Sequence, residues 1–181
     1  MHNQFLSNLT SLPQAGDPDA AERGLQSWRG ECAELADRAR RPGLAALADG
    51  EPGRRVLVAL FGNSPYLSGC ALNDPEWLGE ILTAGPDTAF ERLIAALDQR
   101  PSGVPEDDAG IATNLRIARR RASLLIALAD IAGLWDGAHV TAALARFAEC
   151  AIEAAVAHLL GQARANGDLD QGKVTAVRQR D

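Results

Sequence analysis

Aromatic residues, cysteine and histidine are scarce in this chain of 181 residues. Aromatic side chains make up 4% of the sequence, which contains 3 cysteines and 3 histidines. The cysteines lie far apart, are odd in number and form no Cys-x-x-Cys pair, which argues against a disulfide framework or a structural zinc site. β-Branched residues are also sparse outside a few short runs, and both scarcities favour helix over sheet.

An excess of positive charge and a long apolar run near the N-terminus are also missing. The formal net charge is −6, so no overall field draws in nucleic acid, despite the local cluster Arg119–Arg121. The first residues show neither the basic start nor the apolar stretch of a signal peptide. We therefore expect a cytoplasmic protein with no nucleic-acid partner and no membrane span.

The stretch from Asn114 to Trp135 begins strongly basic and ends almost wholly apolar, and its apolar residues form two adjacent stripes at helical spacing. We interpret it as a central helix that other elements cover on more than one side. A narrow polar side remains, formed by Arg116, Arg119, Arg120, Ser123 and Asp130. Because an unpaired buried charge is costly, Asp130 is expected to reach water, an arginine or a hydrogen-bond donor.

Helical spacing also predicts helices before this stretch. One starts at Asp19 and ends at the Pro42-Gly43 pair, and a short helical turn follows over 44–48. The apolar run 56–61 is compatible with strand or helix, and the residues after it favour helix. Gly62 can end a helix in the left-handed conformation, and Ser64 and Asp74 can each cap a new helix that has proline at its first position.

Further along the chain, a helix is predicted to begin at Gly85-Pro86, and residues 100–110 read as a loop. Thr113 or Asn114 is then predicted to cap the central helix, and Thr141 a final helix that frays beyond Gly161. The residues expected to face inward in that final helix are Leu144, Phe147, Ala148, Ala151, Ala155 and Leu159. Antiparallel pairing of the last two helices is expected to be the main source of stability.

These elements predict an all-α fold, a compact irregular helical bundle of about six to seven helices with a long antiparallel C-terminal helix pair. Residues 1–18 are expected to form a flexible leader and residues 19–162 the helical domain. Residues 163–181 are expected to be a frayed tail or a linker.

The arginine stripe is the candidate functional feature. In one interpretation Arg116, Arg119 and Arg120 face a nucleotide site or an acidic partner surface, and Asp130 orients one of them. In the other, which we favour slightly, the stripe is a solvent-facing side with one internal arginine–aspartate link. We predict no catalytic, cofactor-binding or metal-binding residues in this chain.

Other polar residues receive structural interpretations. Asp168 and Asp170 are expected to lie in a solvated loop, because no strand and no Gly-Ser turn precede them. Asp107-Asp108 is expected to be part of a polar loop. His139 and His158 are isolated in sequence and are expected at the surface or at helix ends. The tryptophans fall on apolar faces and are expected in the core.

Four segments in this order carry a family resemblance. They are FGNSPYL (61–67), a DPE start followed by an apolar helix (74–82), LRIARRRASLLIALADIAG (115–133) and VTAALARFAECAIEAAVAHL (140–159). Together they resemble the N-terminal region of glutamine synthetase adenylyltransferase, a large bifunctional enzyme that attaches AMP to a tyrosine of glutamine synthetase and removes it. The resemblance covers residues 44–160, and the combination is more specific than any one segment.

The resemblance implies partners and cofactors for a longer parent enzyme. That enzyme would use ATP and Mg²⁺, act on glutamine synthetase and respond to the PII signalling protein. Its nucleotidyltransferase motif, a glycine-rich turn with Ser-Asp-x-Asp, does not occur here. We therefore expect residues 163–181 to lead toward a catalytic domain in cis, and the chain alone to be inactive. A truncation would leave an apolar patch where that domain docks.

Two alternatives remain open. The chain could be a free-standing helical interaction module of the same descent that binds a partner without catalysis. It could also be an unrelated helical enzyme, which the absence of a catalytic cluster disfavours.

Overall fold

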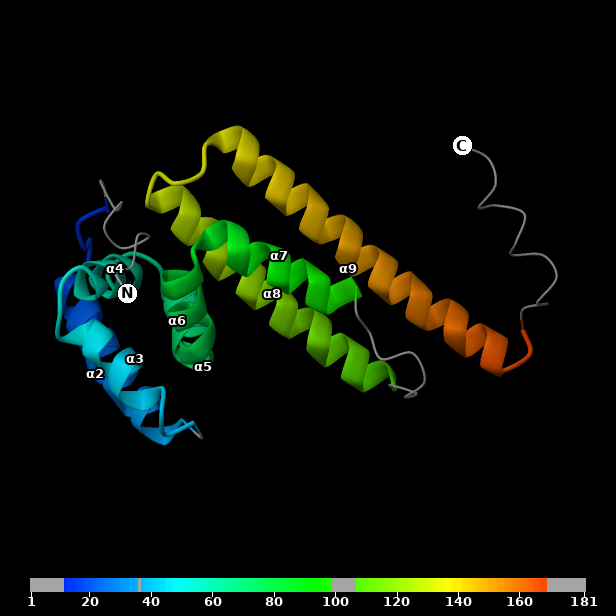
Figure 1. Ribbon diagram of the computed structural model, residues 1–181, viewed down its shortest axis with the longest axis horizontal. Coiled ribbons are helices and arrows are strands. Elements are labelled where there is room, and N and C mark those ends of the chain that lie inside the picture. Colours follow the sequence, from blue (N-terminus) through cyan, green and yellow to red (C-terminus); the bar gives the residue numbers. More distant parts are fainter. Residues whose placement is uncertain (1–11, 36, 99–106, 169–181) are drawn as a thin grey trace.

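The computed structural model describes residues 12–35, 37–98 and 107–168 (Figure 1). Over these ranges the chain is helical and contains no strand, which confirms the predicted all-α class and the helical interpretation of residues 56–61. The elements are α2 (Pro18–Glu34), α3 (Arg41–Ala45), the short 3₁₀ helix η1 (Ala46–Ala48), α4 (Gly53–Phe61), α5 (Pro65–Asn73), α6 (Pro75–Ala84), α7 (Pro86–Asp98), α8 (Asp108–Ile131) and α9 (Gly137–Ala165). Most of the predicted leader and loop, together with Asp170, lie outside the described residues.

Side-chain caps begin most of these helices. The Ser64 hydroxyl accepts a hydrogen bond from the backbone N–H of Leu67, and the Asp74 carboxylate accepts one from that of Trp77. Proline follows each cap, where its missing N–H costs nothing. The predicted starts of α5 and α6 are therefore confirmed.

The predicted caps of α8 and α9 are wrong. Asp107 and Asp136 are the caps, each accepting from the N–H three residues on. Thr113 and Thr141 lie inside the helices, where their hydroxyls donate to the carbonyls four residues earlier. The apolar periodicity begins later than the helix itself, because the first turn of each helix is largely exposed.

The predicted end of α2 is also wrong. The helix stops at Glu34, since Leu35 has extended backbone angles and its carbonyl accepts a hydrogen bond from Arg41 Nε at 2.6 Å. The Pro42-Gly43 pair lies within α3, in keeping with the preference of proline for the first turn of a helix.

Gly62 does not adopt the expected left-handed conformation. Its φ is −84°, and glycine is needed because a Cβ there would lie 2.5 Å from that of Ala15. The neighbouring Asn63 carboxamide donates to the Gln14 carbonyl and accepts from Gly16 N. The Gly-Asn pair therefore holds the chain segment that precedes α2.

The core runs through the whole helical assembly. The most extensive contact between helices joins α2 and α4, and α5 and α6 lie between this pair and the α7–α9 group (Figure 1). The largest fully buried side chains are Trp28, Leu25, Leu57, Leu78, Ile81, Leu82, Leu124, Leu125, Val56 and Cys32. Helix α8 contributes buried residues to the core from Ile111 to Ala129, which fits its predicted central role.

Helix α9 differs from the prediction. After the turn at Gly133 the chain reverses, and α9 runs back along α7 and α8 and past them (Figure 1). It continues beyond Gly161 to Ala165. Its buried residues are Ala143 and Ala154, whereas Leu144 and Leu159, which were expected to face inward, are exposed.

Candidate functional site: the arginine side of α8

The polar side of α8 carries three arginines, Arg116, Arg119 and Arg120. All three are exposed, and none forms an ion pair with another residue of the described ranges. Helical spacing explains their common direction, since residues three and four apart share a face. These cations are thus available to a negatively charged group from outside.

Arg121, the next residue along, was not among the predicted site residues. Its Nε lies 2.7 Å from Asp74 Oδ2, and its guanidinium lies over the Trp77 ring at 5.2 Å from the centroid. The Trp77 indole in turn donates to the Arg121 carbonyl at 3.1 Å. Arg121 therefore joins α8 to the start of α6. In the sequence, only the combination of Asp-Pro-Glu-Trp with a basic helix pointed to this contact.

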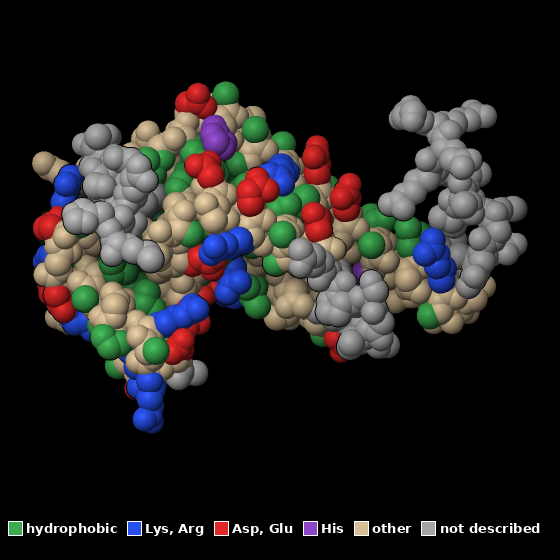
Figure 2. All heavy atoms as spheres, viewed as in Figure 1, with side chains coloured by type: hydrophobic (Ala, Val, Ile, Leu, Met, Phe, Trp, Pro, Cys, Tyr) green, Lys and Arg blue, Asp and Glu red, His purple; other side chains and the backbone are tan. Residues whose placement is uncertain are grey.

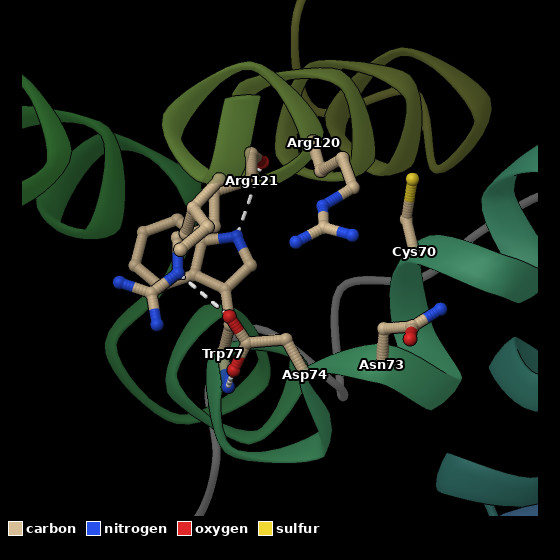
Figure 3. A pocket seen from close by; sticks show the side chains of 7 residues that line it. Cys70, Asn73, Asp74, Trp77, Arg120 and Arg121 are labelled. Atoms are coloured by element: carbon tan, nitrogen blue, oxygen red, sulfur yellow. Dashed lines mark hydrogen bonds and ion pairs between the residues drawn. The ribbon is translucent and has the colours of Figure 1, made fainter. Parts of the chain in front are cut away.

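A small cavity of about 150 Å³ lies beside this contact, between α5, α6 and α8. Its lining residues are Cys70, Asn73, Asp74, Trp77, Ile117, Arg120 and Arg121. Figure 3 shows the Arg120 guanidinium extending into the space between Trp77 and Cys70, while Arg121 turns toward Asp74. In the space-filling view, arginine and acidic side chains adjoin over the middle of the molecule (Figure 2).

The charges of Arg119 and Arg120 act on Cys70 in the wall of the cavity. Burial raises the pKa of the Cys70 thiol, while the charges of Arg120 and Arg119 oppose that rise. Burial raises the pKa of Cys32, which is fully buried, to about 11. Neither thiol is activated as a nucleophile, because the thiolate is the reactive form. The cavity can instead receive a small oxyanion such as a carboxylate or a single phosphate group.

Asp130 is not brought to these arginines. It is exposed and forms no ion pair in the described part of the chain. Ten residues of helix separate it from Arg120, about 15 Å along the axis at about 1.5 Å per residue. Asp130 therefore reaches water, one of the options expected for it. The internal arginine–aspartate link is formed by Arg121 and Asp74 instead.

Asp107 and Asp108 are both exposed, as predicted, but the loop ends at Asp107 because Asp108 already belongs to α8. Asp107 caps α8, and Asp108 Oδ1 lies 2.9 Å from His158 Nε2 and accepts from Gln162 Nε2 at 2.7 Å. These hydrogen bonds, that of His158 first, lower the pKa of Asp108. His158 is thus not a surface residue, since its side chain is only 11% exposed.

The tryptophans are core residues, as predicted, and each indole N–H has an acceptor. Trp28 donates to the Leu44 carbonyl at 2.9 Å and Trp135 to Asp87 Oδ1 at 3.0 Å. His139 stacks on Trp135 with ring centroids 4.3 Å apart. His139 is exposed in the first turn of α9, as predicted, and covers a core tryptophan there.

The described residues do not form a site for catalytic metal ions. No group of three or more His, Cys, Asp or Glu side chains among them could hold a metal ion. None of the described helices is long and apolar enough to cross a membrane. The described residues thus define a helical module with a cluster of exposed arginines on α8.

Comparison with known proteins gives the family. Residues 55–176 match the sequence profile of the family described as glutamate-ammonia ligase adenylyltransferase. The chain belongs to this family, which confirms the resemblance seen in the sequence. No solved structure matches it.

Three relatives are named bifunctional glutamine synthetase adenylyltransferase/adenylyl-removing enzyme. The one from Bradyrhizobium sp. (strain ORS 278) is 35% identical over 172 residues, which are 92% of this chain. The one from Bradyrhizobium diazoefficiens is 38% identical over 169 residues, or 93% of this chain, and that from Xanthobacter autotrophicus 36% over 161 residues, or 89%. In each case the match spans 16% of the relative's length.

Proposed function

We propose that this chain is the N-terminal helical region of a bifunctional glutamine synthetase adenylyltransferase/adenylyl-removing enzyme that regulates nitrogen assimilation in the cytoplasm. The observation that carries the proposal is the identity of 35–38% over more than nine-tenths of the chain to relatives with that name. The helical domain, residues 19–162, would support the catalytic domain, and residues 163–181 would connect the two.

The chemistry of such an enzyme would lie outside the described residues. AMP transfer needs paired carboxylates that hold Mg²⁺ against the phosphoryl oxygens of ATP. The described carboxylates do not suit this role, because Asp74 and Asp107 cap helices and Asp108 is held by His158 and Gln162. We therefore assign this region the role of scaffold and docking surface.

The docking role falls on Arg116, Arg119 and Arg120. Their charges are not neutralised within the described chain, and Arg120 borders a cavity of the size of a small oxyanion. An acidic surface of glutamine synthetase or of the PII protein supplies carboxylates that suit these guanidinium groups. Asp130, exposed at the other end of α8, takes no part in this surface.

The test uses the natural gene product that carries this chain. Incubated with glutamine synthetase, ATP and Mg²⁺, it should add the mass of AMP to a glutamine synthetase tyrosine, and the 181-residue chain alone should not. A gene product that neither transfers AMP to glutamine synthetase nor removes it would contradict the proposal. If the chain instead forms a stable complex with a partner without catalysis, it is a free-standing interaction module.

A second comparison tests the docking surface. The double variant Arg119→Glu/Arg120→Glu should raise the glutamine synthetase concentration that gives half-maximal AMP transfer, by about tenfold. Arg55→Glu, at an exposed arginine of α4, is the matched control and should leave that concentration unchanged. Equal effects of the two changes would remove the docking role from the α8 arginines.

A further inference from the structure

One face of α9 exposes an apolar stripe. Of the large hydrophobic side chains that are exposed in the described residues, all but Tyr66 lie on this helix. Leu144 is 52% exposed, Ile152 63% and Leu159 59%. Together with Ala148 and Val156 they follow one another at intervals of four, four, four and three residues, which places them on a single face. We call this the outer face of α9.

The opposite face of α9 is already occupied. Ala143 and Ala154 are buried, Phe147 and Cys150 are half-buried against α7 and α8, and His158 bonds to Asp108 on α8. The helix is therefore apolar on two opposite sides, as is typical of a helix covered on both. A continuous apolar stripe of this length on a water-exposed helix marks an interaction site.

Acidic residues border the outer face along one edge. Glu149 and Glu153, one helical turn apart, are exposed and form no ion pair in the part of the chain described here. Figure 2 shows acidic and hydrophobic side chains together at the surface of α9. The complementary surface is therefore apolar, with basic residues where it meets this edge.

A second copy of the chain that pairs antiparallel with this face fits its acidic edge poorly. In an antiparallel two-fold pairing of outer faces, both acidic edges lie on the same side, so that like charges meet. The remainder of the family polypeptide is the better occupant. The family match includes all of α9 and continues to residue 176, and each relative carries most of its length outside the matched 16%. Covalent linkage gives such a segment a high effective concentration.

We propose that the outer face of α9 is the surface on which the remainder of the adenylyltransferase polypeptide docks in cis, through an apolar strip flanked by lysine or arginine. This inference rests on the proposed function, because it needs the chain to be part of the longer enzyme. Helix α9 is then a shared element, packed on one side by α7 and α8 and on the other by the following domain.

Thiol labelling measures whether the outer face is covered. In a Cys150→Ser background, Ile152→Cys is made in the 181-residue chain and in the full natural gene product, and its reaction with a maleimide is timed. The introduced thiol should react at least about tenfold more slowly in the gene product, the protection expected of a packed interface. Ser27→Cys, exposed on α2, is the control and should react equally in both.

Equal labelling of the Ile152→Cys variant in the two polypeptides would overturn the proposal, as would a reading frame that closes after codon 181. Sedimentation of the 181-residue chain measures whether two copies associate through this face instead. A dimer that Ile152→Glu dissociates, in the absence of protection in the gene product, would assign the face to a second copy instead.

A second variant tests whether a loss of protection comes from misfolding of the domain. Ile152→Glu should change the urea midpoint of the 181-residue chain little, because the side chain is 63% exposed. In the gene product it should abolish the protection of a cysteine placed at Val156. AMP transfer is measured separately. An active enzyme whose Ile152→Cys thiol is unprotected would refute the docking proposal alone, and protection in an inactive protein would refute the proposed function alone.

Discussion

Asp74 shows how much one residue contributes at the junction of helices. Its Oδ1 accepts the Trp77 N–H and so caps α6, while its Oδ2 pairs with Arg121 of α8. Arg121 in turn covers the Trp77 ring. The cap, the ion pair and the cation–π contact therefore share one carboxylate, on the wall of the cavity that Arg120 borders.

Two substitutions at this position separate the roles. Asp74→Asn keeps a good capping side chain and loses the charge, so it should cost at most about 1 kcal/mol of unfolding free energy, as expected of a part-exposed pair. Asp74→Ala also loses the cap and should cost about 1 kcal/mol more. Urea denaturation of the two variants checks this order, and equal losses would show that the cap contributes nothing.

The ion pairs of α9 predict loss of stability in acid. Hydrogen bonds from Arg146 lower the pKa of Glu91, and those from His158 and Gln162 lower that of Asp108. A carboxylate whose pKa is lower in the folded than in the unfolded state stabilises the fold at pH values above its unfolded-state pKa. This stabilisation is lost as the pH falls through the folded-state pKa. Unfolding free energy should therefore decrease below about pH 4, the ordinary carboxyl range.

The double variant Glu91→Gln/Asp108→Asn should flatten this acid decrease, as followed by urea midpoints between neutral pH and about pH 3. Glu31→Gln, at an exposed carboxylate of α2 for which the described structure shows no ion pair, is the control and should keep the wild-type slope. An unchanged slope in the double variant would contradict the assignment.

Helix α2 contains two glycines in contrasting surroundings. A Cβ on Gly24 would lie 2.3 Å from the Phe61 ring, so this residue sets the close approach of α2 to α4. Gly30, on the same helix, has no atom within 4 Å of where its Cβ would be. The first glycine is required by packing between helices, whereas the second is only an exposed position of low helix propensity.

Alanine substitutions should therefore have opposite signs. Gly24→Ala should destabilise the fold by about 1–3 kcal/mol through overpacking. Gly30→Ala should stabilise it by about 0.5–1 kcal/mol, because alanine is the better helix former. Thermal melting of both variants is the measurement. Equal changes in melting temperature for the two variants, or changes of the reverse sign, would show that α2 and α4 are not in close contact at Phe61.

At the level of elements, the sequence predicted the helices better than their faces. Ser64-Pro65 and Asp74-Pro75 are local signals that the structure confirms, because a cap acts within one turn. The predicted inward face of α9 was wrong because the helix is apolar on two sides, and periodicity does not tell which side packs against the same domain. The Asp108–His158 and Asp74–Arg121 contacts join residues 50 and 47 positions apart, beyond the reach of local pattern.

At the scale of the whole molecule, the chain has a continuous core at its centre and uncovered features at its surface. Arg116, Arg119 and Arg120 of α8 form no ion pair within the described ranges, and the outer face of α9 is exposed. The chain spans 16% of the relatives it matches, and the described residues hold no group that could bind a metal ion. These facts fit a supporting region of a larger enzyme.

The most direct test of this account is the AMP content of glutamine synthetase in cells with and without the gene that carries this chain. Intact-mass spectrometry after a shift from scarce to abundant ammonium should show subunits that gain the mass of AMP in wild-type cells only. Restoring the complete gene should restore the change, and restoring residues 1–181 alone should not. The same AMP occupancy in cells that lack the gene would contradict the account.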